Sequence, residues 1–334
     1  MADLPDTMLA AYLTELGGPE RIRIGHLPVP VPGPTDVLVR TELMAVNHVD
    51  TFVRSGGYRT HTPFPFVIGR DLVGSVARTG EGVDEFAIEE KVWCNSLGHQ
   101  GRQGSFSELA VVPRERLYRL PAQADPATAA SVLHTAATAY LGLFRTGSLR
   151  LGETVFVAGA AGGVGSAAVQ LAVAAGARVI AAAAPEDFDW CRRCGADLLI
   201  DYRDQALPAL LEAAAPEGFD LWWDNSGRHD LDLAVPLLKR GGRIIALAGM
   251  AARPVLPMGA LYTRDASIRG FAISNASAAD LAEAAPVIND LLATKRLISR
   301  INATYPLTAA AEAHRQMEVG VKGRILVASD PDPG

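Results

Sequence analysis

The chain has 334 residues, of which 49% are hydrophobic and 20% are charged, and its formal net charge is −6 at pH 7. This length favours two domains, and this composition supports a large buried core. Acidic and basic residues are interspersed and form no basic stripe, so no nucleic-acid partner is expected.

Three cysteines are too few for a disulfide framework. Cys191 and Cys194 have the spacing of a redox or metal-binding CxxC motif, but no second pair of ligands accompanies them. We therefore expect unpaired helix thiols in a reducing compartment. The segment MADLPDTMLAAYL lacks the basic and apolar regions of a secretory signal, which predicts a cytoplasmic protein.

The first 125 residues favour a mostly β domain. Short alternating runs, such as DVLVRTEL at 36–43 and DLVGSVARTG at 71–80, are separated by proline and glycine turns such as PVPVPGPTD at 28–36. This pattern is typical of a compact domain with many short strands and few helices.

From residue 153 onward, strand-like and helix-like segments alternate. This alternation predicts an α/β domain with a doubly wound parallel sheet, covered by helices on both faces. The expected strands are 153–159, 177–184, 196–202, 219–227, 242–249 and 266–273, and the expected helices are 163–176, 186–194, 205–215 and 231–239.

The C-terminal part returns to the style of the first domain. A helix is expected near 308–319, followed by a turn at VGVKG and the strand RILVAS. We therefore expect the last 60 residues to pack back on the N-terminal domain.

The stretch from 155 to 184 is apolar enough to raise the alternative of a membrane helix. Five glycines, Gln170 and Arg178 interrupt it. Its pieces fit a strand, a helix and another strand better, so no membrane association is expected.

A glycine cluster, AGAAGGVGSAAVQL at 158–171, lies between the first strand and the first helix of the α/β region. Ala160, Gly162 and Gly165 occupy the three positions of a GxGxxG pattern, with alanine in place of the first glycine. In this setting the pattern indicates a dinucleotide site, because bare backbone and a helix N-terminus accommodate a pyrophosphate. The expected contacts come from Ala161, Gly162, Gly163, Val164 and Gly165.

The identity of the dinucleotide is less sharply indicated. The second strand ends in AAAAPED, without the acidic residue at its tip that binds the ribose 2′-hydroxyl in NAD sites. This favours NADPH, although Glu186 and Asp187 follow closely and leave NADH open.

Three motifs in order, VNHVDTFVRSGGY at 46–58, AGAAGGVGSAAVQLA at 158–172 and VKGRILV near the end, resemble the medium-chain dehydrogenase/reductase superfamily. The chain is most similar to its zinc-free quinone oxidoreductase and enoyl reductase branch. The resemblance implies a GroES-like catalytic domain at 1–127, a Rossmann domain at 128–272 and a return to the catalytic domain at 273–334. It also implies an active site in the cleft between the domains and a homodimer.

The resemblance allows zinc to be examined residue by residue. Asn47 and His48 stand where zinc alcohol dehydrogenases have a Cys-His pair, and Gly69, Arg70 and Asp71 stand where they have Gly-His-Glu. The segment 94–108 holds one cysteine instead of the four of the structural zinc lobe. We therefore expect no metal.

Without a metal, reduction of a quinone or an α,β-unsaturated carbonyl compound is easier than oxidation of an alcohol, because hydride adds to an electron-poor carbon. The resemblance places Asn47 beside the nicotinamide and the substrate carbonyl, although an asparagine there also fits a helix N-cap. It places Tyr58 at the position of a proton donor, although a tyrosine packed on the core is an equal alternative. His48 is a candidate acid–base residue.

The resemblance also implies several cofactor contacts. Thr138 matches a residue at the nicotinamide carboxamide, and Tyr202 matches one at the adenosine 2′-phosphate. The family's phosphate-binding lysine aligns with Phe188, for which Arg192 or Arg193 could substitute. Further expected contacts, at the carboxyl edge of the sheet and in the tail, are Asn225, Gly249 and Arg324; for Arg324 a solvated strand charge is the favoured alternative.

Two other functions remain open from the sequence. One is a zinc-free alcohol or ketone oxidoreductase, and the other is an NADPH-binding protein without turnover. Substrate specificity is expected to reside around 58–66 and 250–262.

Overall fold

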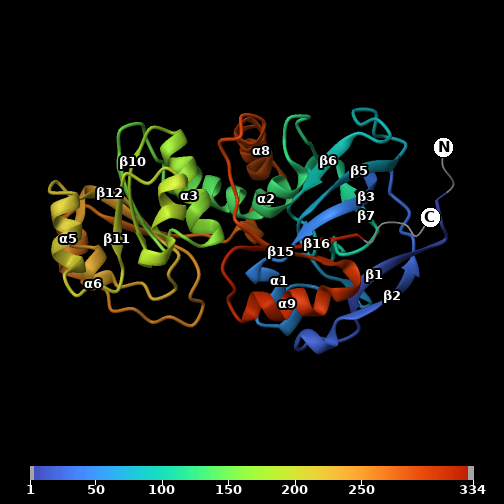
Figure 1. Ribbon diagram of the computed structural model, residues 1–334, viewed down its shortest axis with the longest axis horizontal. Helices are drawn as coiled ribbons and strands as arrows, with labels where there is room; N and C mark the ends of the chain where they lie inside the picture. Colours follow the sequence, from blue (N-terminus) through green and yellow to red (C-terminus); the bar gives the residue numbers. More distant parts are fainter. Residues whose placement is uncertain (1–3, 330–334) are drawn as a thin grey trace. The chain divides into compact units, whose positions relative to one another are not determined.

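The computed structural model describes residues 4–329 of the chain. Within them the fold divides into two compact units, the first formed by residues 4–134 with 277–329 and the second by Thr135–Ala276. Figure 1 shows the first unit rich in strands and the second built of strands alternating with helices.

The first unit contains two mainly antiparallel sheets. Its larger sheet has the described strand order β15-β16-β3-β5-β6-β8, with β7 paired to β3, and its smaller sheet has the order β2-β1-β4. The strands are β1 (Thr7–Leu13), β2 (Arg23–Pro28), β3 (Asp36–Ala45), β4 (Phe66–Val67), β5 (Leu72–Thr79), β6 (Lys91–Cys94), β7 (Leu109–Pro113), β8 (Tyr118–Arg119), β15 (Ile301–Pro306) and β16 (Arg324–Ala328).

The C-terminal segment is part of the N-terminal sheet. β16 runs antiparallel to β3, and Leu326 faces Ala45 in the register. Helix α9 (Ala310–Glu318) packs with Ala313 and Met317 in the same apolar core as strand residues of β3 and β5. Burial of this apolar surface is what joins residues so distant in sequence.

Three further helices belong wholly or partly to this unit: α1 (His48–Ser55), α2 (Pro126–Tyr140) and α8 (Ala278–Ala293). Helix α8 was not among the elements expected from the sequence. Its N-terminus carries a capping box, in which Asp280 N–H donates to Ser277 Oγ at 3.1 Å and Ser277 N–H donates to Asp280 Oδ2 at 2.8 Å. The SxxD spacing was therefore the signal that could have located it.

The second unit is a parallel sheet with the described order β11-β10-β9-β12-β13-β14. Helix α3 lies on one side of the sheet, whereas α5 and α6 lie on the other (Figure 1). The elements are β9 (Thr154–Ala158), α3 (Gly163–Ala174), β10 (Arg178–Ala183), α4 (Phe188–Arg193), β11 (Leu198–Asp201), α5 (Leu207–Ala214), β12 (Phe219–Asp224), α6 (Leu231–Ala234), β13 (Leu238–Ala246), α7 (Met258–Thr263) and β14 (Ser267–Gly270).

The side chains explain this layering. Phe156 of β9 and Trp222 of β12 pack with Leu211 of α5 and Leu231 of α6 in one core cluster. Their neighbours in the strands point to the opposite face, which α3 covers. Apolar residues on both faces of the strands are what a parallel sheet between helix layers requires.

Three predicted elements of this unit were wrong in extent. The helix expected at 231–239 ends at Ala234, because Pro236 has no N–H group with which to continue it, and β13 already begins at Leu238. The strands expected at 219–227 and 242–249 end at Asp224 and Ala246.

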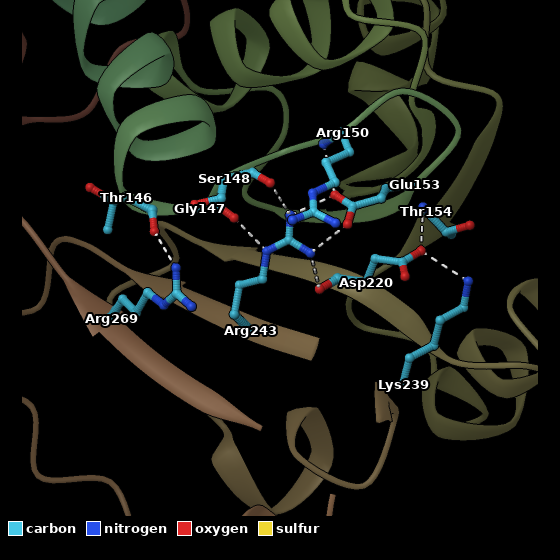
Figure 2. Close-up of polar contacts among 10 residues, drawn as sticks. All are labelled: Thr146, Gly147, Ser148, Arg150, Glu153, Thr154, Asp220, Lys239, Arg243 and Arg269. Carbon is cyan, nitrogen blue, oxygen red and sulfur yellow. Dashed lines mark hydrogen bonds and ion pairs between the residues drawn. The ribbon is translucent and has the colours of Figure 1, made fainter. Parts of the chain in front are cut away.

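A buried arginine secures the sheet near the beginning of β9 (Figure 2). The guanidinium of Arg243 forms paired hydrogen bonds with both carboxylate oxygens of Glu153. It also donates to the carbonyl oxygens of Gly147, Ser148 at 3.2 Å and Asp220 at 2.9 Å. The side chain is 8% exposed, so these bonds replace the water it has lost.

The same region holds the end of α2. The helix continues as a π-helical turn over Leu141–Thr146, and Arg269 donates to the carbonyl oxygen of Thr146 at 2.8 Å. Arg243 donates to the carbonyl oxygens of the next two residues, so the end of this turn is held by side-chain donors from β13 and β14.

No helix of the described residues is long and apolar enough to cross a bilayer.

Candidate functional site

The glycine-rich loop begins where β9 ends. Gly159 has a φ of +70°, a backbone conformation that favours glycine. A Cβ on Gly165 would lie 2.1 Å from the carbonyl oxygen of Gly159, so only glycine allows the first turn of α3 to approach the loop this closely. Gly165 therefore serves packing between helix and loop.

Gly162 has different surroundings. It is exposed and is the N-cap of α3, and a Cβ there would meet nothing nearer than the Gly159 carbonyl oxygen at 3.5 Å. The space beside it is thus open, and the first N–H groups of a helix have no intrahelical acceptor. Ala161, Gly163 and Val164 complete a loop that fits a phosphate group.

Other loops at the carboxyl edge of the sheet lie next to this one. Asn225 directly follows β12; its Oδ1 accepts from Trp223 Nε1 at 2.8 Å, and its Nδ2 lies 3.5 Å from the Gly159 carbonyl oxygen. Gly249 has a φ of +65°, and its Cβ would lie 2.5 Å from the carbonyl oxygen of Gly227. The loops after β12 and β13 are therefore in close contact at the sheet edge, where doubly wound folds bind ligands.

Tyr202 follows β11 and is 48% exposed. The Arg203 guanidinium lies over its ring, 5.6 Å from the centroid, and forms ion pairs with Glu186 at 3.1 Å and Asp201 at 3.2 Å. The cation beside Tyr202 is therefore Arg203. Because Arg203 directly follows Tyr202, the sequence alone could have indicated it as the cation beside this ring.

The two predicted substitutes for the phosphate-binding lysine lie against residues of their own helix. Arg192 pairs with Asp189, and the guanidinium of Arg193 lies over the Trp190 ring. Thr138 is buried in α2, and its contact with a nicotinamide stays a prediction.

In the first unit, Asn47 is the N-cap of α1 and is buried. Its backbone N–H donates to Asp50 Oδ2 at 2.8 Å. Its side chain points elsewhere: Nδ2 donates to Asp71 Oδ2 at 2.9 Å, and Oδ1 accepts from Arg324 Nη2 at 2.7 Å. Asn47 is thus both a cap and the centre of a buried polar cluster.

Arg324 is 8% exposed, which overturns its interpretation as a solvated strand charge. Its Nε donates to the carbonyl oxygen of Ser131 in α2 at 2.8 Å, in addition to the bond to Asn47. The sequence offered little warning, because the arginine opens a strand whose apolar pattern starts one residue later.

Burial dominates the electrostatics of this cluster. It raises the pKa of Asp50 to about 6, although the Arg70 charge opposes the change, and it raises the pKa of Asp71 well above its usual range. Burial, followed by the positive charges of Arg70 and Arg324, lowers the pKa of His134 to about 3. His134 is therefore neutral at physiological pH.

His48 begins α1, and Tyr58 lies three residues beyond the end of this helix. The Tyr58 ring is half-buried against the first unit's core, with its centroid 5.9 Å from that of the His99 ring, and it interacts electrostatically with Arg70. His48 begins the helix; desolvation of its ring, followed by the Arg324 charge, lowers its pKa. The structure therefore places both candidates around the polar cluster.

A metal does not suit these residues. The cluster presents an amide, two guanidinium groups and carboxyl groups already engaged with them, and it contains no thiolate. Within residues 4–329 no three histidine, cysteine or acidic side chains converge as a metal site. That the protein works without zinc stays a prediction.

Two family profiles match the chain. The alcohol dehydrogenase GroES-like domain matches residues 33–122, and the zinc-binding dehydrogenase domain matches residues 163–290. The first match lies in the strand-rich unit, and the second begins at α3 and covers most of the parallel-sheet unit.

Curated relatives extend over most of the chain. A quinone oxidoreductase from Lama guanicoe is 27% identical over 96% of this chain and 97% of its own length. An NADPH-dependent alkenal/one oxidoreductase from the chloroplast of Arabidopsis thaliana is 32% identical over 76% of this chain and 66% of its own length.

Solved structures give similar matches. A mycobacterial protein complexed with NADPH is 26% identical, with a TM-score of 0.83 over 96% of this chain and 99% of its own. An NAD-dependent alcohol dehydrogenase is 30% identical, with a TM-score of 0.87 over 97% of this chain and all of its own. These relatives combine one fold with several substrates and with both nicotinamide cofactors.

Proposed function

Since the chain belongs to the medium-chain dehydrogenase/reductase superfamily of oxidoreductases, we propose that it uses NADPH to reduce quinones or α,β-unsaturated carbonyl compounds without a metal. Membership of this superfamily and the similar structure complexed with NADPH support a nicotinamide cofactor, which would supply the hydride when bound. The choice of NADPH and of this substrate class is our inference.

The cofactor-binding part of the proposal rests on the second unit. The open space at Gly162 and the N–H groups at the start of α3 would hold the pyrophosphate. Tyr202 and Arg203 would bind the adenosine ribose, and the Arg203 charge favours a 2′-phosphate. Glu186 and Asp201 already neutralise part of that charge, so we expect a preference for NADPH and not an exclusive requirement.

The substrate part rests on the first unit. The Asn47 amide would donate to the substrate carbonyl oxygen, on which negative charge develops during reduction. Tyr58 would provide the proton that the product takes up, and His48 is the second candidate for that role. Electrophilic assistance would thus come from hydrogen bonds in place of a Lewis acid.

One observation carries this proposal: the amide of Asn47, a residue that the sequence resemblance aligns with a zinc ligand of the zinc dehydrogenases, lies between Asp71 and Arg324. An amide held this way can donate to an oxygen but cannot supply the thiolate of a zinc site. Substrates that are already electrophilic therefore suit it better than simple alcohols.

The test follows oxidation of NADPH and NADH by the purified full chain, with and without EDTA. The acceptors are 1,4-benzoquinone, 9,10-phenanthrenequinone, trans-2-hexenal and acetone. We expect EDTA-resistant turnover with a quinone or the enal, a higher kcat/KM with NADPH, and no turnover with acetone. Loss of activity on chelation, turnover of acetone alone, or cofactor binding without any turnover would each contradict the proposal.

Tyr58→Phe tests the proton donor. Removing the hydroxyl should lower kcat by about a hundredfold, the lower range for a positioned general acid. Tyr305→Phe is the matched control, because Tyr305 is also half-buried against the core of the first unit. Equal kcat values for the wild type and Tyr58→Phe would remove Tyr58 from the mechanism.

A further inference from the structure

A buried guanidinium is costly to place in a protein interior, and Arg324 meets that cost with few partners. Burial lowers its pKa, and the nearby charges of Asp71 and Asp50 oppose this change. Its hydrogen bonds connect two elements, because Nε donates to the Ser131 carbonyl of α2 and Nη2 donates to the Asn47 side chain at the start of α1. An apolar side chain would fill such a place at lower cost if packing were its only purpose.

The neighbours of Asn47 allow one orientation of its amide. A guanidinium can only donate hydrogen bonds, so a flipped amide would place its NH2 group against the Nη2 of Arg324. On the other side, Asp71 Oδ2 accepts from Nδ2 at 2.9 Å. Arg324 therefore fixes which atom of Asn47 points in each direction.

This orientation matters for an incoming carbonyl group. An asparagine amide has two N–H donors: the bond to Asp71 uses one of them, and Asp50, which also interacts with the Asn47 side chain, would have to yield the other to a substrate oxygen. The guanidinium also withdraws electron density from Oδ1, which strengthens the remaining N–H as a donor. Positive charge thus lies one hydrogen bond behind the group that would meet the substrate oxygen.

We infer that Arg324 is a positioning residue for the reduction, which holds and polarises the Asn47 amide so that its second N–H faces the substrate carbonyl oxygen. This inference rests on the proposed function, because it assigns Asn47 to the substrate. Arg324 itself need not touch the substrate or the cofactor.

A kinetic cycle tests the coupling. In the full chain, Arg324→Met should lower kcat by about 10- to 100-fold with KM changed less than about threefold, because a group used in the transition state is misaligned. Arg324→Lys should recover part of this loss, since lysine keeps the charge without the planar fork. Arg324→Met combined with Asn47→Ala should be no slower than Asn47→Ala alone, because the two residues act as one unit. The inference would be overturned if the kcat losses of the two single variants multiplied in the double variant, or if Arg324→Met changed KM only.

Arg54→Met is the matched control for a merely structural effect. Arg54 is 1% exposed in the same unit and is bound to Glu318, His314 and the carbonyl oxygen of Gly17. We expect it to lower the unfolding temperature without a change in kcat at temperatures where the chain is folded. An equal fall in kcat for the Arg54 and Arg324 variants would show that lost packing explains both.

A second readout separates this inference from the proposed function. With nitrogen-15 asparagine in the chain, the Asn47 side-chain amide signal is identified by its loss in Asn47→Ala. We expect Arg324→Met to shift this signal, because its Oδ1 loses a charged donor. No turnover by the wild-type protein together with this shift would reject the proposed reaction and keep the bond; an unchanged signal would overturn the positioning role whatever the activity.

Discussion

At the scale of single residues, Gly162 and Gly165 stand three positions apart and have different physical roles. A side chain at Gly165 would collide with the Gly159 carbonyl oxygen, whereas one at Gly162 would enter open space. Gly162 therefore leaves room for a ligand, and Gly165 allows the helix to pack against the loop. Substitutions can separate the two roles.

Gly162→Val should leave the unfolding temperature within about 2 °C of the wild type, because its backbone is extended (φ −72°, ψ 168°) and its Cβ is unobstructed. The affinity for NADPH should fall at least about tenfold, since the side chain would occupy the phosphate's space. Titration of NADPH fluorescence measures the affinity.

Gly165→Ala tests the packing role of the other glycine. Its Cβ would lie 2.1 Å from a backbone atom that cannot move aside cheaply. We expect the free energy of unfolding to fall by about 1–3 kcal/mol, as for an overpacked core. If Gly162→Val bound NADPH as tightly as the wild type, the loop would not be the phosphate site.

At the scale of elements, the amino and carboxyl ends of the parallel strands have different functions. The carboxyl ends lead into the loops that hold Gly162, Asn225 and Gly249. Near the start of β9, Arg243 instead connects Glu153, the end of the π-helical turn and Asp220 (Figure 2). This second cluster stabilises the fold.

Arg243→Met should lower the free energy of unfolding by about 3–5 kcal/mol, because it leaves the Glu153 carboxylate and buried carbonyls without their donor. Urea denaturation followed by circular dichroism gives this value. The matched control is Arg240→Met, on the same strand, because the Arg240 side chain is 83% exposed in its pair with Asp265. A similar urea midpoint for both variants would contradict a special role for the buried arginine.

At the scale of the whole molecule, buried titratable groups determine the response to acid. His134 and His314 have pKa values lowered to about 3, mainly by burial, so the folded chain keeps them neutral where the unfolded chain protonates them. Asp50 and Asp71 act in the opposite sense, since their raised pKa values let the folded chain bind protons first. The two pairs partly offset each other.

His314→Gln isolates one of these contributions. The folded pKa of His314 lies below the unfolded value of 6.5, so its contribution to stability is constant above pH 6.5 and becomes steadily less favourable as the pH falls towards 3. Relative to the wild type, the variant should gain about 1.4 kcal/mol for each pH unit below 6.5. Urea unfolding at several pH values between 7 and 4.5 measures the difference.

Exposed His26 provides the control for that experiment. His26→Gln is measured over the same pH range, and the difference from the wild type should depend more steeply on pH for His314→Gln than for His26→Gln. A constant difference for His314→Gln would show that the buried imidazole is protonated as readily as in the unfolded chain.

Much of the fold and part of the site follow from local sequence. Alternating apolar runs and the glycine loop predicted β9, α3 and β10, because these elements depend on neighbouring residues. The helix cap at Asn47 was the alternative to its predicted contact with the nicotinamide. Pro236 limits α6 to fewer residues than its apolar pattern predicted, and the capping box of α8 is a sequence signal for a helix that was not predicted.

By itself, the sequence determined the fold class and the glycine-rich turn between β9 and α3, because periodicity and glycine spacing express them directly. Only the tertiary structure showed that Arg324 is buried and bonded to Asn47, which lies 277 positions earlier in the chain. The pairing of β16 with β3 brings the two together. A contact between such distant residues depends on how the sheet is assembled, and no local pattern records it.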